Sequence, residues 1–386
     1  MIREQWPGAL GPVACVVGAR PNFMKMAPIL RAFAGNLPTL LVHTGQHYDK
    51  DMNDRLFEDL GLPRPDINLE VGSGTHAVQT AEVMRRFEPV VDERRPSAVL
   101  VVGDVNSTLA CALVAVKKGV PVVHVEAGLR SYDRSMPEEI NRVLTDQLAD
   151  LLYTTERSAA DNLGREGIPP ERIRFVGNVM IDSLLSNRSQ ARVPRDILAA
   201  AGADPALAEA GSGYGLVTLH RPSNVDQAET LEPLLGVLRE ASDRLPLVFA
   251  LHPRTRANIQ RFGLGTLVDS RRLILLPPQG YLEMLGLMAG ATLVLTDSGG
   301  LQEETTALGV PCLTLRENTE RPITVDHGTN TLVGRDRGAI LAGVDDILKS
   351  GGKRGRVPEL WDGHAAERIA ADLAAWLLGR HARVNG

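Results

Sequence analysis

Two carboxylate positions are the first candidates for chemistry in this chain. The apolar run Pro121–Val125 predicts a buried strand, and Glu126 follows its last residue. A helix is predicted to begin at Pro137, with Glu138 and Glu139 in its first turn. Ligands of open α/β sheets bind beyond the carboxyl ends of the strands, where charged side chains commonly perform acid/base chemistry. We therefore expect an active site at this edge.

Two basic residues follow the first predicted strand, Val13–Gly18. Arg20 stands at the tip of this strand, and we expect Lys25 in the first turn of the following helix. Cations are unfavourable at a helix N-terminus because the helix dipole is positive there. A solvated basic pair would explain both residues without any function. An anionic ligand that offsets the electrostatic cost is the preferred interpretation.

Asp104 and His220 also follow apolar runs. Asp104 comes directly after Ala98–Gly103 and could serve as a helix N-cap, for which aspartate is well suited. Because Asn106 and Ser107 are available for capping, we predict a catalytic or ligand-binding role for Asp104. A lone histidine is more often structural. His220, however, opens the first strand-to-helix loop of the second half of the chain, and we predict that it belongs to the site.

The clearest phosphate signal is a glycine pair at the start of a predicted helix. An apolar strand ends there, and Ser298, Gly299 and Gly300 open the next helix with exposed backbone N–H groups. Such a helix N-terminus is a ready anion site. Glu304 lies further along the helix, where its carboxylate could accept two hydrogen bonds from a ribose diol. Arg321, after the next strand, strengthens the prediction of a bound phosphate.

A second glycine pattern, Gly72–Ala77, matches the G-x-G-x-x-G/A dinucleotide fingerprint but lacks its context. It does not lie in the first βαβ unit, and no acidic residue ends a strand about 20 residues later. We interpret it as a polar turn before a helix around Val78–Phe87. The sequence therefore predicts no nicotinamide site, and we expect neither a cofactor nor a metal.

Apolar runs alternate with helical patterns along most of the chain. Most runs are continuously apolar, as expected of parallel strands covered on both faces, and the alternation is that of βαβ units. The rhythm breaks at Ser189–Tyr214, which we interpret as an interdomain or peripheral connection with room for a short helix. The predicted strands are Val13–Gly18, Thr39–His43, Ala98–Gly103, Pro121–Val125, Leu151–Thr154, Ile173–Val176, Leu216–Leu219, Leu247–Leu251, Leu273–Leu276, Thr292–Thr296 and Pro311–Leu315.

Composition limits the classes of protein that fit. The 386 residues predict two domains at roughly 150 residues each. The net charge of -5 argues against a protein that coats nucleic acid. No apolar segment reaches the roughly 20 residues of a membrane span. The 3 cysteines lie in or beside apolar runs without metal-ligand spacing, so we expect reduced core thiols in a cytoplasmic protein.

Taken together, these motifs resemble the non-hydrolysing UDP-N-acetylglucosamine 2-epimerase family. The resemblance extends from about residue 13 to residue 334, and the set of motifs is far more specific than any one of them. The matching strings are Gly18–Pro28 (GARPNFMKMAP), Thr44–His47 (TGQH), Gly103-Asp104, His124–Arg130 (HVEAGLR), Pro137–Glu139, Asn141-Arg142, His220-Arg221, Thr296–Gly300 (TDSGG), Gln302–Glu304 and Thr319–Pro322 (TERP).

The resemblance implies an α/β, GT-B-like fold of two Rossmann-like, doubly wound domains with the active-site cleft between them. Residues 1–188, joined by the C-terminal helix 364–386, are expected to form the domain with the catalytic carboxylates. Residues 189–363 are expected to form the UDP-binding domain. The family expectation is a cytoplasmic homodimer that serves polysaccharide biosynthesis, with no membrane or nucleic-acid partner.

The implied reaction is reversible inversion at C2 of the sugar of UDP-N-acetylglucosamine (UDP-GlcNAc), which gives UDP-N-acetylmannosamine (UDP-ManNAc). The family route eliminates UDP to a 2-acetamidoglucal intermediate and then re-adds it. This route is chemically coherent because no carbonyl group lies beside C2 to acidify its proton. Breaking the C1–O bond makes that proton labile, which requires carboxylates near C1 and C2 and cations on the departing diphosphate.

Roles are carried over from the family one residue at a time. The acid/base and cation-stabilising carboxylates would be Asp104, Glu126 and Glu138, and which of them removes the C2 proton stays open. Glu139 is left out of this set, and it is expected either on the helix surface or as support for the dipole at the helix N-terminus. The implied catalytic set is Asp104, Glu126, Glu138, His220 and Lys25. The implied UDP-sugar-binding set is Arg20, Lys25, His220, Gln279, Met284, Ser298, Gly299, Gly300, Glu304 and Arg321, with Gln279 and Met284 bordering the uracil.

Two departures separate this chain from many bacterial members of the family. Those members carry His-Arg-Arg-Glu after the second domain's first strand, where this chain has His-Arg-Pro-Ser at residues 220–223. They also carry Gln-His-Arg in an early loop, where this chain has Gln-His-Tyr-Asp-Lys-Asp-Met at residues 46–52. The missing basic residues belong, in that group, to a second UDP-GlcNAc site that activates the enzyme. The departures therefore predict that this regulation is lost.

Other functions stay open. Within the resemblance, the substrate could be a decorated sugar such as UDP-2,3-diacetamido-glucuronic acid, or a hydrolysing homologue could release free ManNAc and UDP. A GT-B glycosyltransferase would use the same UDP cleft, but it predicts an acceptor groove, and the pair Glu126 and Glu138 argues against it. A non-catalytic protein that binds nucleotide sugars would leave the carboxylates and the histidine at the strand ends unexplained.

Overall fold

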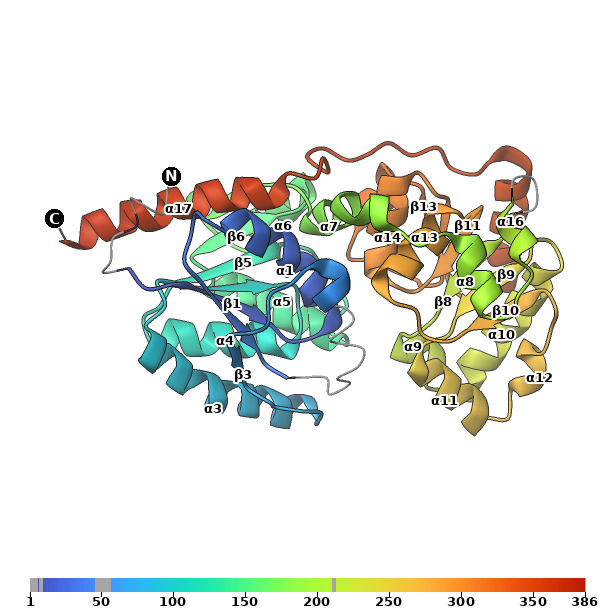
Figure 1. The fold of residues 1–386 in the computed structure, drawn as a ribbon, viewed down its shortest axis with the longest axis horizontal. Helices are drawn as coiled ribbons and strands as arrows, with labels where there is room; N and C mark the ends of the chain where they lie inside the picture. Colours follow the sequence, from blue (N-terminus) through green and yellow to red (C-terminus); the bar gives the residue numbers. More distant parts are fainter. Residues whose placement is uncertain (1–5, 7–9, 46–56, 210–212, 386) are drawn as a thin grey trace. The chain divides into compact units, whose positions relative to one another are not determined.

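The computed structural model describes residues 6, 10–45, 57–209 and 213–385, and it leaves out the side chains of Arg20, Val384 and Asn385. Its contacts divide the chain into two compact units. The first unit contains residues up to Ser186 together with Glu359–Gly386, and the second contains Asn187–Pro358. Each unit is built on one parallel sheet with helices connecting its strands (Figure 1).

The sheet of the first unit has the order β3-β2-β1-β4-β5-β6-β7, and its described pairings are all parallel. Strands β1, β4, β5 and β6 are buried along their whole length, which accounts for their continuously apolar sequences. The strands are β1 (Val13–Val17), β2 (Thr39–His43), β3 (Ile67–Asn68), β4 (Ala98–Val102), β5 (Val122–Ala127), β6 (Leu151–Thr154) and β7 (Ile173–Phe175).

The sheet of the second unit has the order β10-β9-β8-β11-β12-β13, again with parallel pairings. Its registers are regular, for example Thr296 of β11 opposite Thr218 of β8. The strands are β8 (Gly215–Thr218), β9 (Leu247–Ala250), β10 (Leu273–Leu276), β11 (Leu293–Thr296), β12 (Cys312–Thr314) and β13 (Asn330–Leu332). Both sheets thus confirm the predicted pair of Rossmann-like folds.

Helices connect nearly all successive strands, as the βαβ pattern predicted. In the first unit they are α1 (Arg20–Phe33), α3 (His76–Arg94), α4 (Asn106–Lys117), α5 (Pro137–Leu148), α6 (Arg157–Arg165), α7 (Val179–Asn187) and α17 (Ala365–Asn385). In the second they are α8 (Pro194–Ala200), α9 (Pro222–Val225), α10 (Ala228–Ser242), α11 (Pro253–Arg261), α12 (Gly265–Val268), α13 (Tyr281–Ala289), α14 (Gly299–Leu308), α15 (Pro322–Asp326) and α16 (Arg337–Ser350).

The predicted elements are confirmed with small shifts at their ends, and two short strands are additional. The sequence did not predict β3 or β13, which lie at the edges of the two sheets. The predicted connection at Ser189–Tyr214 contains α8 and a short 3₁₀ turn at Pro205–Ala208. The glycine pattern Gly72–Ala77 is a turn that leads into α3, whose N-cap Thr75 accepts a hydrogen bond from the Val78 N–H at 3.3 Å.

The core of the first unit forms between the central strands and helices α3 and α4. Val99 and Val101 of β4 belong to one buried cluster with Phe87 of α3 and Ala112 of α4. Burying an aliphatic or aromatic side chain of this size contributes about 1.5–3 kcal/mol, so such clusters hold the strand ends in place. As predicted, the 3 cysteines are buried free thiols, namely Cys15, Cys111 and Cys312.

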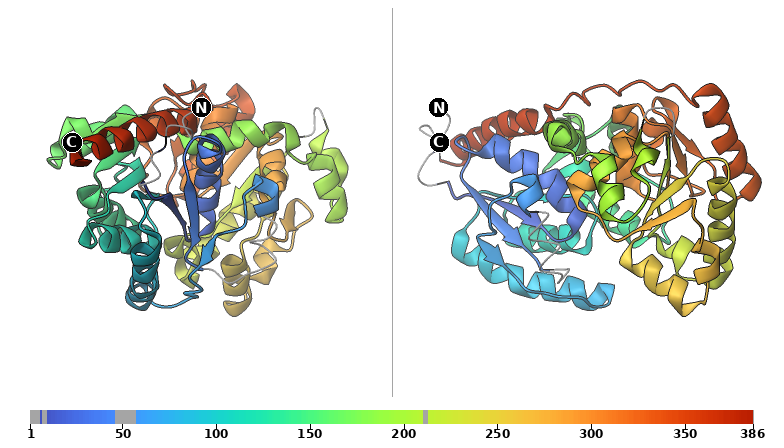
Figure 2. Two further views of the ribbon diagram at one scale, coloured as in Figure 1. Left: turned by 60° about the vertical axis from the view of Figure 1, so that its left-hand side comes forward. Right: turned by 45° about the vertical axis from the view of Figure 1, so that its right-hand side comes forward.

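The C-terminal segment belongs to the first unit, although the second unit precedes it in the chain. Helix α17 packs against α1 (Figure 1 and Figure 2). Trp361 Nε1 donates to the Thr155 carbonyl at 3.1 Å, and the Asp182 carboxylate accepts from the Ala366 N–H at 2.7 Å. Tyr153 Oη donates to Asp372 at 2.9 Å. These hydrogen bonds therefore hold the C-terminal segment against the first unit.

Gly177 should be essential for this attachment. It has a φ of 93°, and a Cβ atom there would lie 2.1 Å from the Leu360 carbonyl oxygen. Gly167 has a similar φ of 82° with nothing within 4 Å, which makes it a matched control. We expect Gly167→Ala to cost about 1–2 kcal/mol from backbone strain alone. Gly177→Ala should cost at least about 1–3 kcal/mol more, because a backbone carbonyl must move.

Thermal unfolding of the two alanine variants, followed by limited proteolysis, measures this difference. Gly177→Ala should melt several degrees below Gly167→Ala and should release the C-terminal segment earlier. Equal melting temperatures and equal cleavage would show that the segment does not depend on the close approach at Gly177.

Candidate active site

In both sheets the strand order reverses beside the first strand of the unit. Strand β1 lies between β2 and β4, and β8 lies between β9 and β11. Open α/β sheets bind ligands beyond the carboxyl ends of the strands at this reversal. The predicted residues follow these strand ends: Asp104 after β4, Glu126 near the end of β5, His220 after β8 and Ser298 after β11.

Glu126 occupies a strained backbone position. The pairing of β5 with β6 shifts register between Val125 and Ala127, and Glu126 has a φ of 69°. A non-glycine residue held in this left-handed region costs about 1–3 kcal/mol, and such residues cluster at functional sites. Its carboxylate lies 2.5 Å from Lys25 Nζ, and the two side chains are only 2% and 6% exposed, respectively. The bulge thus presents Glu126 to a buried cation.

Lys25 lies in the second turn of α1, so the prediction of a first-turn position is wrong. The helix begins at Arg20, five residues earlier. Lys25 is therefore removed from the positive helix terminus, and the anion beside it is Glu126 of the same unit. Asn22, in the same motif, donates from Nδ2 to the Val102 carbonyl at 2.9 Å and so ties the first loop to β4.

Asp104 is not the N-cap residue of α4, in agreement with the prediction, and it forms an ion pair instead. The N-cap residue of α4 is Val105, which makes no side-chain capping hydrogen bond, so neither Asn106 nor Ser107 is the N-cap as the sequence suggested. The Asp104 carboxylate pairs with the guanidinium of Arg142. Asn141 Nδ2 donates to the Asp104 carbonyl oxygen at 2.9 Å. Two neighbouring residues of α5 therefore hold this loop.

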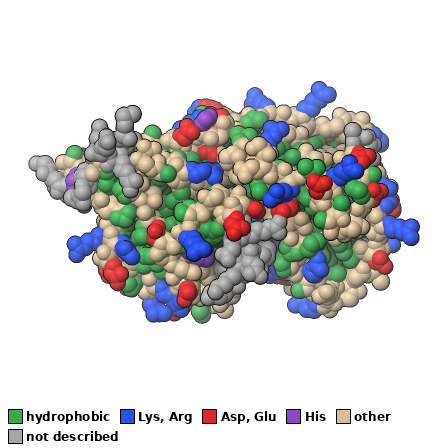
Figure 3. Space-filling view, in the orientation of Figure 1, with side chains coloured by type: hydrophobic (Ala, Val, Ile, Leu, Met, Phe, Trp, Pro, Cys, Tyr) green, Lys and Arg blue, Asp and Glu red, His purple; other side chains and the backbone are tan. Residues whose placement is uncertain are grey.

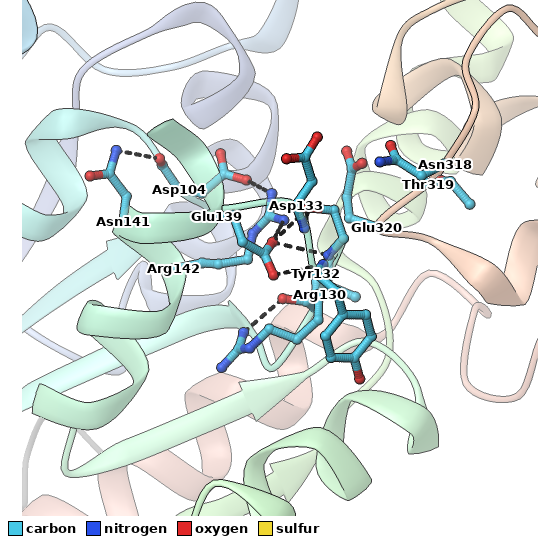
Figure 4. Close-up of polar contacts among 12 residues, drawn as sticks. Asp104, Arg130, Tyr132, Asp133, Glu139, Asn141, Arg142, Asn318, Thr319 and Glu320 are labelled. Carbon is cyan, nitrogen blue, oxygen red and sulfur yellow. Dashed lines mark hydrogen bonds and ion pairs between the residues drawn. The ribbon is translucent and has the colours of Figure 1, made fainter. Parts of the chain in front are cut away.

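Glu139 is buried, with only 2% of its surface exposed, so its predicted place on the helix surface is wrong. Its carboxylate accepts hydrogen bonds from the backbone N–H groups of Ser131 at 3.0 Å and Tyr132 at 2.9 Å. It also accepts from Arg142 Nη1 at 2.6 Å. Figure 4 shows Arg142 between Glu139 and Asp104. Glu139 therefore connects the loop after β5 to the carboxylate after β4.

Helix α5 as a whole turns polar side chains inward. Glu138 is in its first turn, as predicted, and is half-buried. Ile140 and Leu144 are 41% and 44% exposed, which reverses the usual arrangement of an amphipathic helix. The buried residues of α5 are Glu139, Asn141, Arg142, Thr145 and Asp146. This face of the helix positions polar groups rather than closing a hydrophobic core.

His220 begins the corresponding edge of the second unit. Its Nδ1 lies 3.0 Å from the carboxylate of Asp297, which is fully buried. Burial alone would raise the pKa of Asp297, but the hydrogen bond and charge of His220 and the N–H groups of His220 and Arg221 lower the pKa overall. Asn224 Nδ2 also donates to Asp297 at 3.1 Å. Asp297 therefore fixes the orientation of the His220 ring.

At the predicted phosphate site, the expected order of a strand, a glycine pair and a helix is confirmed. Ser298 is the N-cap of α14, and its side chain makes no capping hydrogen bond. A Cβ atom on Gly299 would lie 2.5 Å from Arg321 Nη1, so only glycine allows this approach. Arg321 pairs with Glu303 at 3.0 Å and with Glu320 at 2.5 Å. A guanidinium and helix N–H groups thus converge within one unit, an arrangement suited to an anion.

Glu304 lies on the buried side of α14. The pKa of Glu304 is raised to about 8. Burial is the largest cause, the charge of Glu303 also raises the pKa, and the hydrogen bond from Tyr281 partly opposes the rise. The Tyr281 hydroxyl lies 3.3 Å from its carboxyl oxygen. Gln279 and Met284 flank the start of α13 and are half-buried, and Gln279 Nε2 donates to the Pro277 carbonyl at 2.7 Å.

Some predictions fall outside the described structure. The side chain of Arg20 is not described, so its contact with the ligand stays a prediction. The loop at residues 46–52, which carries one of the two departures, is also not described, and the predicted loss of regulation stays a prediction. Among the described residues, no group of His, Cys, Asp or Glu side chains could hold a metal ion. No helix in the described ranges is long and apolar enough to cross a membrane. Acidic and basic side chains are intermixed on the face shown in Figure 3.

The structure adds partners that sequence reasoning missed. Arg142 holds Asp104, and Asp297 holds His220. The available signal for Arg142 was its spacing from Glu139, because residues three apart on a helix are neighbours. For Asp297 the signal was its position directly after a strand. The adjacency of β8 and β11 that brings it to His220 is a tertiary feature.

Two Rossmann-like units, each with polar groups at its strand reversal, place the protein in the GT-B-like class of α/β enzymes. A family model described as UDP-N-acetylglucosamine 2-epimerase matches residues 32–374. The chain belongs to this family.

Relatives of known function cover nearly the whole chain. The UDP-N-acetylglucosamine 2-epimerase of Methanocaldococcus jannaschii is 42% identical over 366 residues, which are 94% of this chain and 98% of that protein. A crystal structure of this relative in complex with UDP-GlcNAc and UDP has a TM-score of 0.86 at 40% identity, covering 94% and 99% of the two chains. The UDP-2,3-diacetamido-2,3-dideoxy-D-glucuronate 2-epimerase of Pseudomonas aeruginosa is 41% identical over 368 residues, 94% of this chain and 99% of that protein.

The buried pair of Lys25 and Glu126 can be tested by removing its members separately and together. Lys25→Met leaves the Glu126 carboxylate buried without its cation, and breaking a buried pair in this way costs about 3–5 kcal/mol. We expect the double variant Lys25→Met, Glu126→Gln to recover most of this stability, because no charge is then left behind. Thermal unfolding of the wild type, Lys25→Met, Glu126→Gln and the double variant measures the coupling.

An exposed ion pair provides the control for this cycle. Arg157 and Glu359 lie 2.6 Å apart with side chains 71% and 53% exposed. Such a pair contributes at most about 1 kcal/mol, so Arg157→Met should barely change the melting temperature. A double variant as unstable as Lys25→Met alone would contradict the pairing.

Glu304 should make the stability depend on pH. The pKa of Glu304 is about 8 in the folded protein, against roughly 4.3 for an ordinary glutamate. Between these values the folded state retains a proton that the unfolded state has lost. Stability should therefore be higher at low pH and fall as pH rises towards 8, by up to roughly 1.4 kcal/mol per pH unit.

Glu304→Gln imitates the neutral carboxyl group and should reduce the difference in melting temperature between pH 6 and pH 9. Glu82→Gln is the matched control, since hydrogen bonds from Arg85 and Arg86 lower the pKa of this half-buried carboxyl and keep its titration below the tested range. A wild-type pH dependence that survives in Glu304→Gln would show that another group causes it.

Proposed function

We propose that this protein catalyses the reversible epimerisation of UDP-GlcNAc to UDP-ManNAc at C2, and is therefore an isomerase. The observation that carries the proposal is that Asp104 and Glu126 lie at the ends of the adjacent strands β4 and β5 and Glu138 in the first turn of the helix that follows, in a chain that belongs to the 2-epimerase family. Inversion at C2 needs proton transfer and charge stabilisation there, and carboxylates supply both. A glycosyltransferase would leave these three carboxylates unexplained.

The proposed mechanism is elimination of UDP followed by its re-addition. A base removes the C2 proton as the C1–O bond breaks, which leaves 2-acetamidoglucal and UDP. Reprotonation at C2 on the opposite face, with bond formation between C1 and the UDP oxygen, completes the inversion. Positive charge develops at C1 in both steps, and fixed carboxylates stabilise it. Arg142 and Lys25 support this role by holding Asp104 and Glu126 in place.

We assign the nucleotide to the second unit, within residues 189–363, and the proton chemistry to residues 1–188. The start of α14 at Ser298, Gly299 and Gly300 would receive the diphosphate, together with Arg321. Glu304 would accept hydrogen bonds from the ribose hydroxyls. Gln279 and Met284 would border the uracil, while His220, Lys25 and Arg20 would contact the diphosphate and the sugar. The crystal structure of the archaeal relative with UDP-GlcNAc and UDP supports a UDP-sugar ligand.

A second candidate substrate is UDP-2,3-diacetamido-2,3-dideoxy-D-glucuronate. The relative named for this substrate is 41% identical to the chain, against 42% for the archaeal UDP-GlcNAc 2-epimerase, and both cover 94% of it. The reacting C1–C2 centre, with its 2-acetamido group, is the same in the two sugars. The choice therefore depends on groups that contact C3 and C6 rather than on the carboxylates.

Nuclear magnetic resonance of UDP-GlcNAc incubated with the enzyme in deuterium oxide tests the proposed function. We expect deuterium at C2 and a new UDP-ManNAc signal, because the abstracted proton exchanges with solvent before it is returned. Glu126→Gln and Glu138→Gln should each slow exchange by at least about 100-fold, as expected for loss of a general acid or base.

Other outcomes would reject the proposal in distinct ways. Free UDP together with free ManNAc would indicate hydrolysis. No change with UDP-GlcNAc, but C2 exchange with the diacetamido-glucuronate substrate, would favour the second candidate. No exchange with either nucleotide sugar would reject 2-epimerase activity.

A further inference from the structure

Asp146 and His124 form a buried pair behind the two strand ends that carry Asp104 and Glu126. Asp146 Oδ1 lies 2.7 Å from His124 Nδ1, and His124 Nε2 lies 2.8 Å from the Gly103 carbonyl oxygen. Both side chains are fully buried. Because a carboxylate and a carbonyl oxygen both accept hydrogen bonds, both ring nitrogens face acceptors. The ring therefore bridges helix α5 to the end of β4.

The second oxygen of Asp146 reaches the other side of the bulge. Oδ2 accepts a hydrogen bond from the Gly128 N–H at 3.1 Å and pairs with Arg130 Nη2 at 2.7 Å. His124 is two residues before Glu126, and Gly128 is two residues after it. One carboxylate on α5 thus holds both sides of the residue whose φ is 69°.

The same pair also fixes the neighbouring strand end. Gly103, whose carbonyl oxygen faces the His124 ring, directly precedes Asp104 in the chain. Strands β4 and β5 are adjacent, with Val101 opposite His124. The positions of Glu126 and Asp104 relative to one another therefore depend on one buried imidazole and one buried carboxylate.

We propose that His124 and Asp146 are positioning residues for the epimerisation, holding Glu126 in its left-handed conformation and at a fixed place relative to Asp104. The inference rests on the proposed function for the roles of Glu126 and Asp104. A purely stabilising contact would be made as well by apolar side chains, because buried ion pairs are often replaceable by hydrophobic residues without loss of stability. A strained backbone, by contrast, persists only where its surroundings over-determine it.

Steady-state kinetics of C2 exchange test the proposal with a control on the same strand. Asp150 Oδ2 accepts the Val122 N–H at 2.9 Å and so holds the opposite end of β5. We expect His124→Gln and Asp146→Asn to lower kcat by roughly 100-fold, the size of effect that displacing a catalytic group by about 1 Å produces. KM should stay near its wild-type value, because most of the UDP contacts are assigned to the second unit. Asp150→Asn should retain the wild-type kcat even where it lowers the melting temperature.

A kcat near the wild-type value in Asp146→Asn, or an equal loss of kcat in Asp150→Asn, would overturn the positioning role. Crystal structures of the wild type and Asp146→Asn give a readout that does not depend on the substrate. Departure of Glu126 from the left-handed region in the variant supports the proposal. A Glu126 unchanged in φ and still paired with Lys25 overturns it. Absence of C2 exchange in the wild type would reject the proposed function instead, and the two crystal structures would still decide the positioning role.

Discussion

The first unit depends on a helix that buries charge instead of hydrocarbon. An ordinary amphipathic helix gains its stability from an apolar inward face, but α5 places Glu139, Arg142 and Asp146 there. Each of these groups would be strongly destabilising if buried without a partner. Their partners come from the loops after β4 and β5, so the helix is stable against the sheet only when those loops adopt one arrangement. The contacts that stabilise α5 against the sheet are therefore the same contacts that position the proposed catalytic carboxylates.

Two strained residues follow from this requirement. Glu126 and Tyr132 have φ values of 69° and 59°, and each lies beside backbone N–H groups that a carboxylate of α5 accepts. Asp146 holds the Gly128 N–H, and Glu139 holds the N–H of Tyr132 itself. The cost of each left-handed residue is about 1–3 kcal/mol, which charge-assisted hydrogen bonds to buried carboxylates can offset. The carboxylates of α5 thereby hold the chain between β5 and α5 at the two residues whose backbone conformation is least favourable.

The fold could be predicted from the sequence because burial on both faces leaves a strong mark on a strand. The central strands are continuous apolar runs, whereas β3 and β13 are short, partly exposed edge strands with no such run. The strand ends also gave the candidate carboxylates, since a charge directly after an apolar run is visible in one dimension. What pairs with those charges is not visible, because Lys25 and Glu126 meet only after β1 and β5 join one sheet. Glu139 was misplaced for a related reason, because the loop N–H groups that its buried carboxylate accepts meet it only in the folded structure.

The second unit meets a different electrostatic problem at the start of α14. Arg321 lies against Gly299, next to helix N–H groups that already carry partial positive charge, which is an unfavourable place for a cation. Glu303 and Glu320 offset that cost, and Glu320 also pairs with Arg316 at 2.7 Å. The guanidinium is thus held in one orientation by groups of the protein, at the price of much of its net charge. An anion at this helix terminus would therefore be recognised mainly by fixed N–H donors, whose directions select a phosphate group by geometry as well as by charge.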